Sequence, residues 1–156
     1  MAARVHEELA YDAPVEAVAA MLADPSFREE VLARQRVLRG AVSIDDGRVR
    51  VEQVQAARGL PSFATKLVGD EITIVQEEHW RTPTEADLAI SIPGKPGDMS
   101  GRATLAPRGD GTVESVDLSV SVGIPLVGGK IEKLVADLLR TALRKEHEVG
   151  VEWLAR

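Results

Sequence analysis

Residues 116–125 read Val-Asp-Leu-Ser-Val-Ser-Val-Gly-Ile-Pro and lead into a long amphipathic segment that ends near Trp153. The alternation of apolar and polar residues over 116–122 is typical of a strand with one buried face. From 126 to 155, apolar residues recur at spacings of three and four, which predicts a helix about 45 Å long at ~1.5 Å per residue. A curved sheet closed by such a helix forms a lined cavity. This ending therefore favours a container over a catalytic framework.

The composition is that of a globular protein and excludes several chemistries. The 156 residues suit one domain over 1–156, with 44% apolar and 28% charged residues. A net charge of −6 makes nucleic acid an unfavourable partner, because an acidic surface repels phosphates. The absence of cysteine excludes disulfides and thiolate chemistry. We find no apolar leader and no run of ~20 apolar residues, and so expect a cytoplasmic protein without integral membrane association.

The remaining pattern predicts a β-α-α-β-β-β-β-β-β-α order. A helix begins near Asp12, which we expect to cap it, and Asp24-Pro25 ends this helix and opens a second over 25–35. Asp46-Gly47 suits a tight hairpin turn. Gly128-Gly129 permits close approach to the sheet, or the regular helix begins only at Lys130. The expected strands are 4–11, 36–44, 48–57, 70–81, 85–92, 99–106 and 112–123.

This order, with the ending Ile-Pro-Leu-Val-Gly-Gly-Lys-Ile-Glu at 124–132, resembles the START-like (SRPBCC, helix-grip) superfamily. The segments 76–80, 101–105 and 146–154 further resemble an uncharacterised actinobacterial family within it. The resemblance implies an α+β helix-grip fold, in which a curved seven-stranded antiparallel sheet wraps around the long C-terminal helix and two short helices follow strand 1. It also implies a cavity between sheet and helix. Members include lipid-transfer domains, plant pathogenesis-related allergens and polyketide cyclases, so a fold of this kind does not specify a function.

The expected cavity wall is aliphatic. Alternation places Val116, Leu118 and Val120 on the inward face of one strand, and such a wall suits an acyl chain, an isoprenoid or a polyketide. A dozen buried methylenes at ~0.8 kcal/mol each contribute roughly 10 kcal/mol before ordering costs. The alternative is that these residues only fill the core. The predicted ligand-binding residues are Ile72, Ile74, Gln76, Glu78, Trp80, Leu88, Ile90, Val116, Leu118, Val120, Leu134, Leu138, Phe63 and Leu67.

Several polar residues share the inward parity. Continuing from Ile72 and Ile74 places Gln76 and Glu78 inside, unless a β-bulge turns Glu78 outward. Convergent polar groups in an apolar pocket orient a ligand. In START-like cyclases and hydratases they perform acid–base chemistry, so Glu78 and Glu7 are the candidate catalytic residues. If Glu78 is catalytic, Glu78→Gln should abolish turnover and leave stability nearly intact. The other polar residues of inward parity are Glu7, Gln53 and Gln55.

Two further features have structural and functional interpretations. Leu60, Phe63, Ala64 and Leu67 share one face of a short predicted helix, which forms either a lid over the cavity or a permanent plug. The histidines at 6, 79 and 147 lack metal-binding spacing, and surface positions explain them.

Three functions remain open. The leading hypothesis is a non-catalytic protein that binds or carries a small hydrophobic ligand without a cofactor or metal. The first alternative is a cyclase, dehydratase or hydrolase on the same fold. The second is a protein-interaction module with a filled core, whose exposed apolar patch would bind the partner. The oligomeric state stays undetermined.

Overall fold

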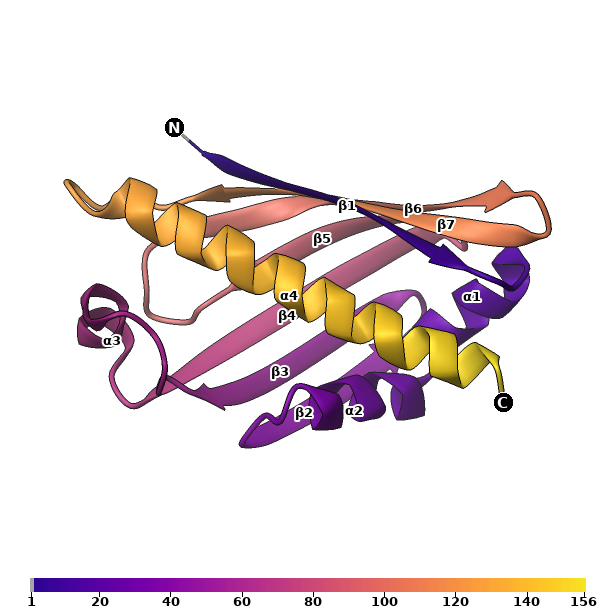
Figure 1. Cartoon of the computed structure of the whole chain (residues 1–156), viewed down its shortest axis with the longest axis horizontal. Helices are drawn as coiled ribbons and strands as arrows, with labels where there is room; N and C mark the ends of the chain where they lie inside the picture. The colour runs from indigo at the N-terminus through magenta and orange to yellow at the C-terminus, as the bar shows by residue number, and fades with distance from the viewer. Residues whose placement is uncertain (1) are drawn as a thin grey trace.

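The chain forms one curved antiparallel sheet, and the C-terminal helix α4 lies across one face of it (Figure 1). The computed structural model describes residues 2–156. The strands are β1 (Ala3–Tyr11), β2 (Arg39–Asp45), β3 (Arg48–Ala56), β4 (Glu71–Thr82), β5 (Glu85–Ser91), β6 (Asp98–Arg108) and β7 (Gly111–Ser121). The helices are α1 (Val15–Leu22), α2 (Pro25–Arg34), α3 (Ser62–Val68) and α4 (Gly128–Leu154).

The strand order is β1-β7-β6-β5-β4-β3-β2, and every neighbouring pair is antiparallel. Strands β2 to β7 follow one another as a meander, and β7, the last strand, pairs with β1, the first. Helices α1 and α2 therefore carry the chain from one edge of the sheet to the other, as Figure 1 shows. This arrangement confirms the predicted helix-grip fold.

Local sequence signals explain most element boundaries. The side chain of Asp24 accepts a hydrogen bond from the Ser26 amide at 2.8 Å, which caps α2. The predicted Asp12 cap is wrong, because α1 begins after Pro14 and has no side-chain cap. Asp46 and Gly47 have φ values of 47° and 78°, as a two-residue type I′ hairpin requires.

The long helix begins at Gly128, two residues later than the expected start at 126. A Cβ atom at Gly128 would lie 2.5 Å from the carbonyl oxygen of Val122, so only glycine permits this approach to the end of β7. Glu132, one turn along, accepts a hydrogen bond from the Val122 amide at 2.7 Å. These contacts attach the start of α4 to the sheet.

The other end of α4 packs against the N-terminal helices. Val18, Met21 and Phe27 are almost fully buried there, beside Val149 of α4. Arg34 and Arg156 add surface ion pairs across this junction. With both ends held, the middle of α4 spans the sheet, and side chains do not completely fill the space beneath it.

Candidate ligand-binding site

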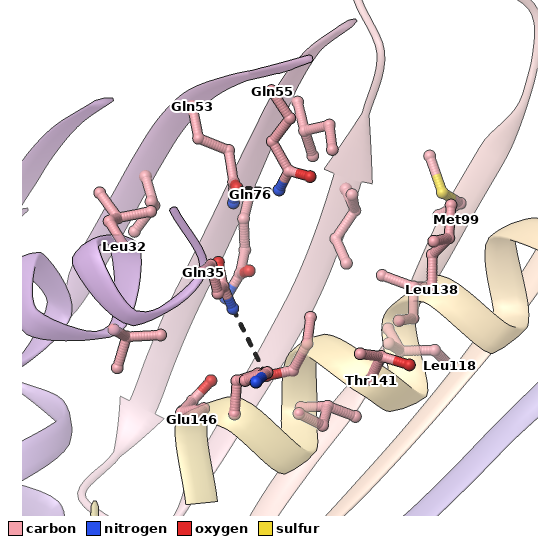
Figure 2. A pocket seen from close by; sticks show the side chains of 18 of the residues that line it. Leu32, Gln35, Gln53, Gln55, Gln76, Met99, Leu118, Leu138, Thr141 and Glu146 are labelled. Carbon is pink, nitrogen blue, oxygen red and sulfur yellow. Dashed lines mark hydrogen bonds between the residues drawn. The ribbon is translucent and has the colours of Figure 1, made fainter. Parts of the chain in front are cut away.

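A cavity of about 280 Å³ lies between the sheet and α4. Its wall comes from α2, α4 and strands β3 to β7, so residues distant in sequence converge on it. Most of the wall is apolar, and the polar residues come from both helices and the sheet. Figure 2 shows Leu138 and Thr141 on α4 opposite Gln53, Gln55 and Gln76 on the sheet.

Nine of the predicted ligand-binding residues lie on this wall: strand alternation places eight of them on the face beneath α4, and the ninth is on α4. They are Ile72, Ile74, Gln76, Glu78, Leu88, Ile90, Val116, Leu118 and Leu138. Gln53 and Gln55, also predicted to point inward, line it as well.

Five predicted residues lie outside the wall. Val120 is completely buried in the packed cluster near the start of α4, and Leu134 is half-buried on α4 without lining the cavity. Trp80 turns toward the end of the sheet where α1 packs. Phe63 and Leu67 are on α3, which lies beyond the sheet end in Figure 1, and only Leu60 of that segment reaches the cavity.

Arg28 and Glu78 form a buried ion pair on the wall. The two terminal nitrogens of Arg28 each donate to a different oxygen of Glu78 at 2.8 Å. The two side chains are only 4% and 5% exposed. Glu78 also accepts hydrogen bonds from Trp80 Nε1 at 2.8 Å and from Gln76 Nε2. Arg28 Nε donates to the Leu22 carbonyl at 2.9 Å, so the pair is satisfied within the protein.

These partners decide the charge state of Glu78. Burial alone would raise the pKa of its carboxyl, but the Arg28 charge and the three donor side chains outweigh burial and lower it. Burial likewise lowers the pKa of Arg28, and the neighbouring carboxylates raise it by more. Glu78 is therefore an ionised anchor of Arg28 rather than a free acid or base. From the sequence we expected Glu78→Gln to leave stability nearly intact. The buried ion pair instead predicts that this variant loses much of its folding stability.

Glu7, the other catalytic candidate, lies outside the cavity wall. Its carboxylate is 3.6 Å from Arg144 of α4, between β1 and the helix. Glu7 has the inward parity of its strand. However, β1 is an edge strand that runs directly beneath α4, so the Glu7 side chain lies under the helix and not in the cavity.

Two carboxyls that we did not predict line the cavity. Glu114 on β7 is 4% exposed, and one of its oxygens has no hydrogen-bond partner in the described part of the chain. Glu146 on α4 is half-buried on the same wall. Burial raises the pKa of both groups, and the charges of Glu146 and Glu78 raise that of Glu114 further.

The sequence did contain signals for these residues. Glu114 has the same parity as Val116 and Leu118 on one strand. Glu146 falls between Ala142 and Val149 at spacings of four and three, and Arg28 precedes Val31 by three. If charged residues had been included in these periodic patterns, Glu114, Glu146 and Arg28 would all have been predicted to point inward.

Gln35, just after α2, joins this helix to α4. Its Nε2 atom donates to the carbonyl oxygen of Ala142 at 3.4 Å, drawn as the dashed line in Figure 2. Gln35 also lines the cavity, and exposed Ala56, Leu138 and Thr141 lie on its rim. This rim is where the cavity meets solvent.

Other features of residues 2–156 lie outside this cavity or concern metal and membrane binding. A shallower hollow of about 440 Å³ lies beside α1 and Trp80, outside the space under α4. No group of three His, Asp or Glu side chains in these residues is arranged to hold a metal. Within the same residues, every helix is too short or too polar to cross a membrane. His147 is half-buried rather than exposed, and its Nε2–H donates to the Ala10 carbonyl at 2.7 Å.

The sheet, the long helix and the cavity between them form a helix-grip fold. The chain belongs to the family described as "Protein of unknown function (DUF2505)", whose model matches residues 6–154. A relative in Mycobacterium tuberculosis, the uncharacterized protein Rv0481c, is 29% identical over 133 residues, which cover 80% of this chain and 76% of the relative.

Solved structures share this fold at low sequence identity. A START superfamily protein from Mycobacterium smegmatis superposes with a TM-score of 0.61 and 17% identity, over 97% of this chain and 98% of that one. The di-domain ARO/CYC StfQ from the steffimycin biosynthetic pathway gives a TM-score of 0.68 and 10% identity, over 97% of this chain and 50% of that one. At these identities the likeness concerns the fold alone.

Proposed function

We propose that this protein binds or carries a small hydrophobic molecule in the cavity between the sheet and α4. The observation that carries the proposal is the cavity of about 280 Å³ with its largely aliphatic wall. A packed interior would leave no such volume, so the cavity favours binding over an interaction module with a filled core. The START-like fold supports this choice, because the same architecture occurs in a START superfamily protein.

The cavity size restricts the ligand. A volume of about 280 Å³ equals that of about nine liquid water molecules at ~30 Å³ each. A medium-length acyl chain or a compact isoprenoid or polyketide fits this volume. A longer chain would extend past Leu138 and Thr141 into solvent. Each methylene that leaves water contributes ~0.8 kcal/mol before ordering costs.

A catalytic role has less support than binding. Glu78 is occupied by donors on both oxygens, and Glu7 lies outside the wall. Neither predicted candidate is thus placed to exchange a proton with a ligand in the cavity.

The test is uptake of N-phenyl-1-naphthylamine, an uncharged apolar probe whose fluorescence rises in apolar surroundings. Wild-type protein is expected to bind it saturably. Ala142→Leu fills cavity volume from α4 and should weaken binding, whereas Ala89→Leu adds the same methylenes on the exposed outer face and should not. Equal binding by the two variants would contradict the proposal, as would no uptake by wild type. Mass spectrometry of gently purified protein, native and then extracted, tests for a co-purifying ligand.

A further inference from the structure

The cavity has one acidic end that the aliphatic wall does not explain. Glu114 and Glu146 both line it, and burial, followed by the charge of Glu146, raises the pKa of Glu114. One oxygen of Glu114 is buried without a hydrogen-bond partner among residues 2–156. The hydroxyl of Tyr11, a side chain only 2% exposed, is likewise unpartnered, and both carboxyls influence its pKa. Of these two atoms, the Glu114 oxygen belongs to a residue that lines the cavity, so a ligand there can supply the partner that the protein does not provide.

The nearby cations do not supply that partner. Arg28 is committed to Glu78 through two hydrogen bonds and to the Leu22 carbonyl through a third. Lys145 reaches the wall, but it has no carboxylate within 4.0 Å among the described residues and does not contribute to the shifts of Glu114 or Glu146. The acidic pair therefore lacks a cation of its own.

We propose that Glu114 and Glu146 bind the protonated amino group of a hydrophobic amine whose apolar body fills the aliphatic part of the cavity. This inference rests on the proposed function and narrows its ligand class. An ammonium group has three hydrogen-bond donors and one positive charge. It therefore complements the two carboxylates, including the Glu114 oxygen that has no hydrogen-bond partner. A ligand carboxylate would meet like charge, because Glu78 already occupies Arg28.

Ionisation of the pair gives the binding a characteristic pH dependence. Burial raises the pKa of Glu114 and of Glu146, while Arg28 opposes and Glu78 adds to that effect. Without ligand the pair holds protons at pH values where surface carboxyls have lost theirs. Ammonium binding favours the ionised form, so it releases protons and strengthens as pH rises through the raised pKa values. It weakens again near the pKa of the amine, about 10 by analogy with lysine.

The experiment compares three probes of equal chain length, octylamine, n-octanol and octanoate, by isothermal titration calorimetry at neutral pH. Octylamine is expected to bind about ten- to a hundredfold more tightly than n-octanol, with octanoate weakest. Glu114→Gln and Glu146→Gln should each weaken octylamine binding far more than n-octanol binding, so that the preference is lost. Glu148→Gln, on the exposed side of the same helix, is the matched control and should retain it. Heats measured in phosphate and Tris should differ for octylamine because protons are released.

The outcomes separate the two proposals. If n-octanol binds and octylamine has no advantage, or if Glu114→Gln keeps the full preference, the amine site is refuted and the hydrophobic cavity stands. If none of the three probes binds, both are refuted. Binding of n-octanol by each variant also demonstrates that its cavity has folded.

Discussion

Replacing Arg28 by methionine isolates the ion pair on which the cavity wall depends. The substitution removes both hydrogen bonds at 2.8 Å to Glu78 and leaves that carboxylate buried at 5% exposure. Trp80 and Gln76 remain as donors, but no positive charge then faces Glu78. The variant thus tests how much an unpaired, buried carboxylate lowers the free energy of unfolding.

The magnitude follows from burial. Two hydrogen bonds to a charged group at ~1.5–3 kcal/mol each give roughly 3–6 kcal/mol. Removing one member of a buried ion pair costs about 3–5 kcal/mol, because the other charge is left desolvated. Solvent screening reduces this little, since both side chains are at most 5% exposed. We therefore expect Arg28→Met to lower the free energy of unfolding by about 3–5 kcal/mol.

Urea unfolding followed by circular dichroism at neutral pH measures this loss. Glu78→Gln should also destabilise strongly, because Arg28 then stays charged and buried. The double variant Arg28→Met/Glu78→Gln removes both charges and keeps an oxygen for Trp80, so it should be more stable than either single variant. The reasoning is refuted if Arg28→Met loses less than ~1 kcal/mol, or if the losses of the two single variants simply add.

Two further predictions concern the surroundings of the acidic pair. The folded-state pKa of Glu114 lies above its ordinary value of 4.5, so the folded state binds more protons and stability falls as pH rises from that value through the raised pKa. Urea unfolding at several pH values should show a slope of up to about 1.4 kcal/mol per pH unit per proton, and Glu114→Gln should flatten it; an unchanged slope contradicts the assignment. Gly150→Ala improves helix propensity, yet its Cβ would lie 2.7 Å from Tyr11 Cε1 and 3.2 Å from Met21 Cε. We expect a net loss of about 1–3 kcal/mol in thermal or urea unfolding, and a gain in stability would show that the ring moves freely.

Features that depend on residues close together in the chain could be predicted from the sequence. Asp46-Gly47 forms the predicted turn because both positions must adopt positive φ, which these residue types tolerate. The period-two alternation of β4 places Ile72 and Ile74 on the wall, since adjacent side chains on a strand point to opposite faces. The order of the elements and the resemblance to helix-grip proteins then led to the correct sheet and long helix.

Strand alternation also placed residues on the correct face of the sheet, but it did not show which of them lie at the cavity. Val120 and Leu118 have the same parity and belong to the same packed cluster, but only Leu118 also lines the cavity. The difference depends on where α4 approaches the sheet closely. That approach is set at the ends of the helix, by Gly128 against Val122 at one end and by α1 and α2 at the other.

The sequence by itself determined the strands, the turns, the amphipathic helix and the inward face of the strands after residue 70, because these follow from short-range sterics and periodicity. Only the tertiary structure decided which buried charges meet. Arg28 and Glu78 are 50 residues apart, and their pairing depends on how α2 packs against β2 and α4. That pairing directs the terminal nitrogens of Arg28 to Glu78, so Glu114 and Glu146 feel its charge without a hydrogen bond from it. Electrostatic compensation acts through space, so the acidic end of the cavity arises from the folded arrangement of four elements and from no local pattern.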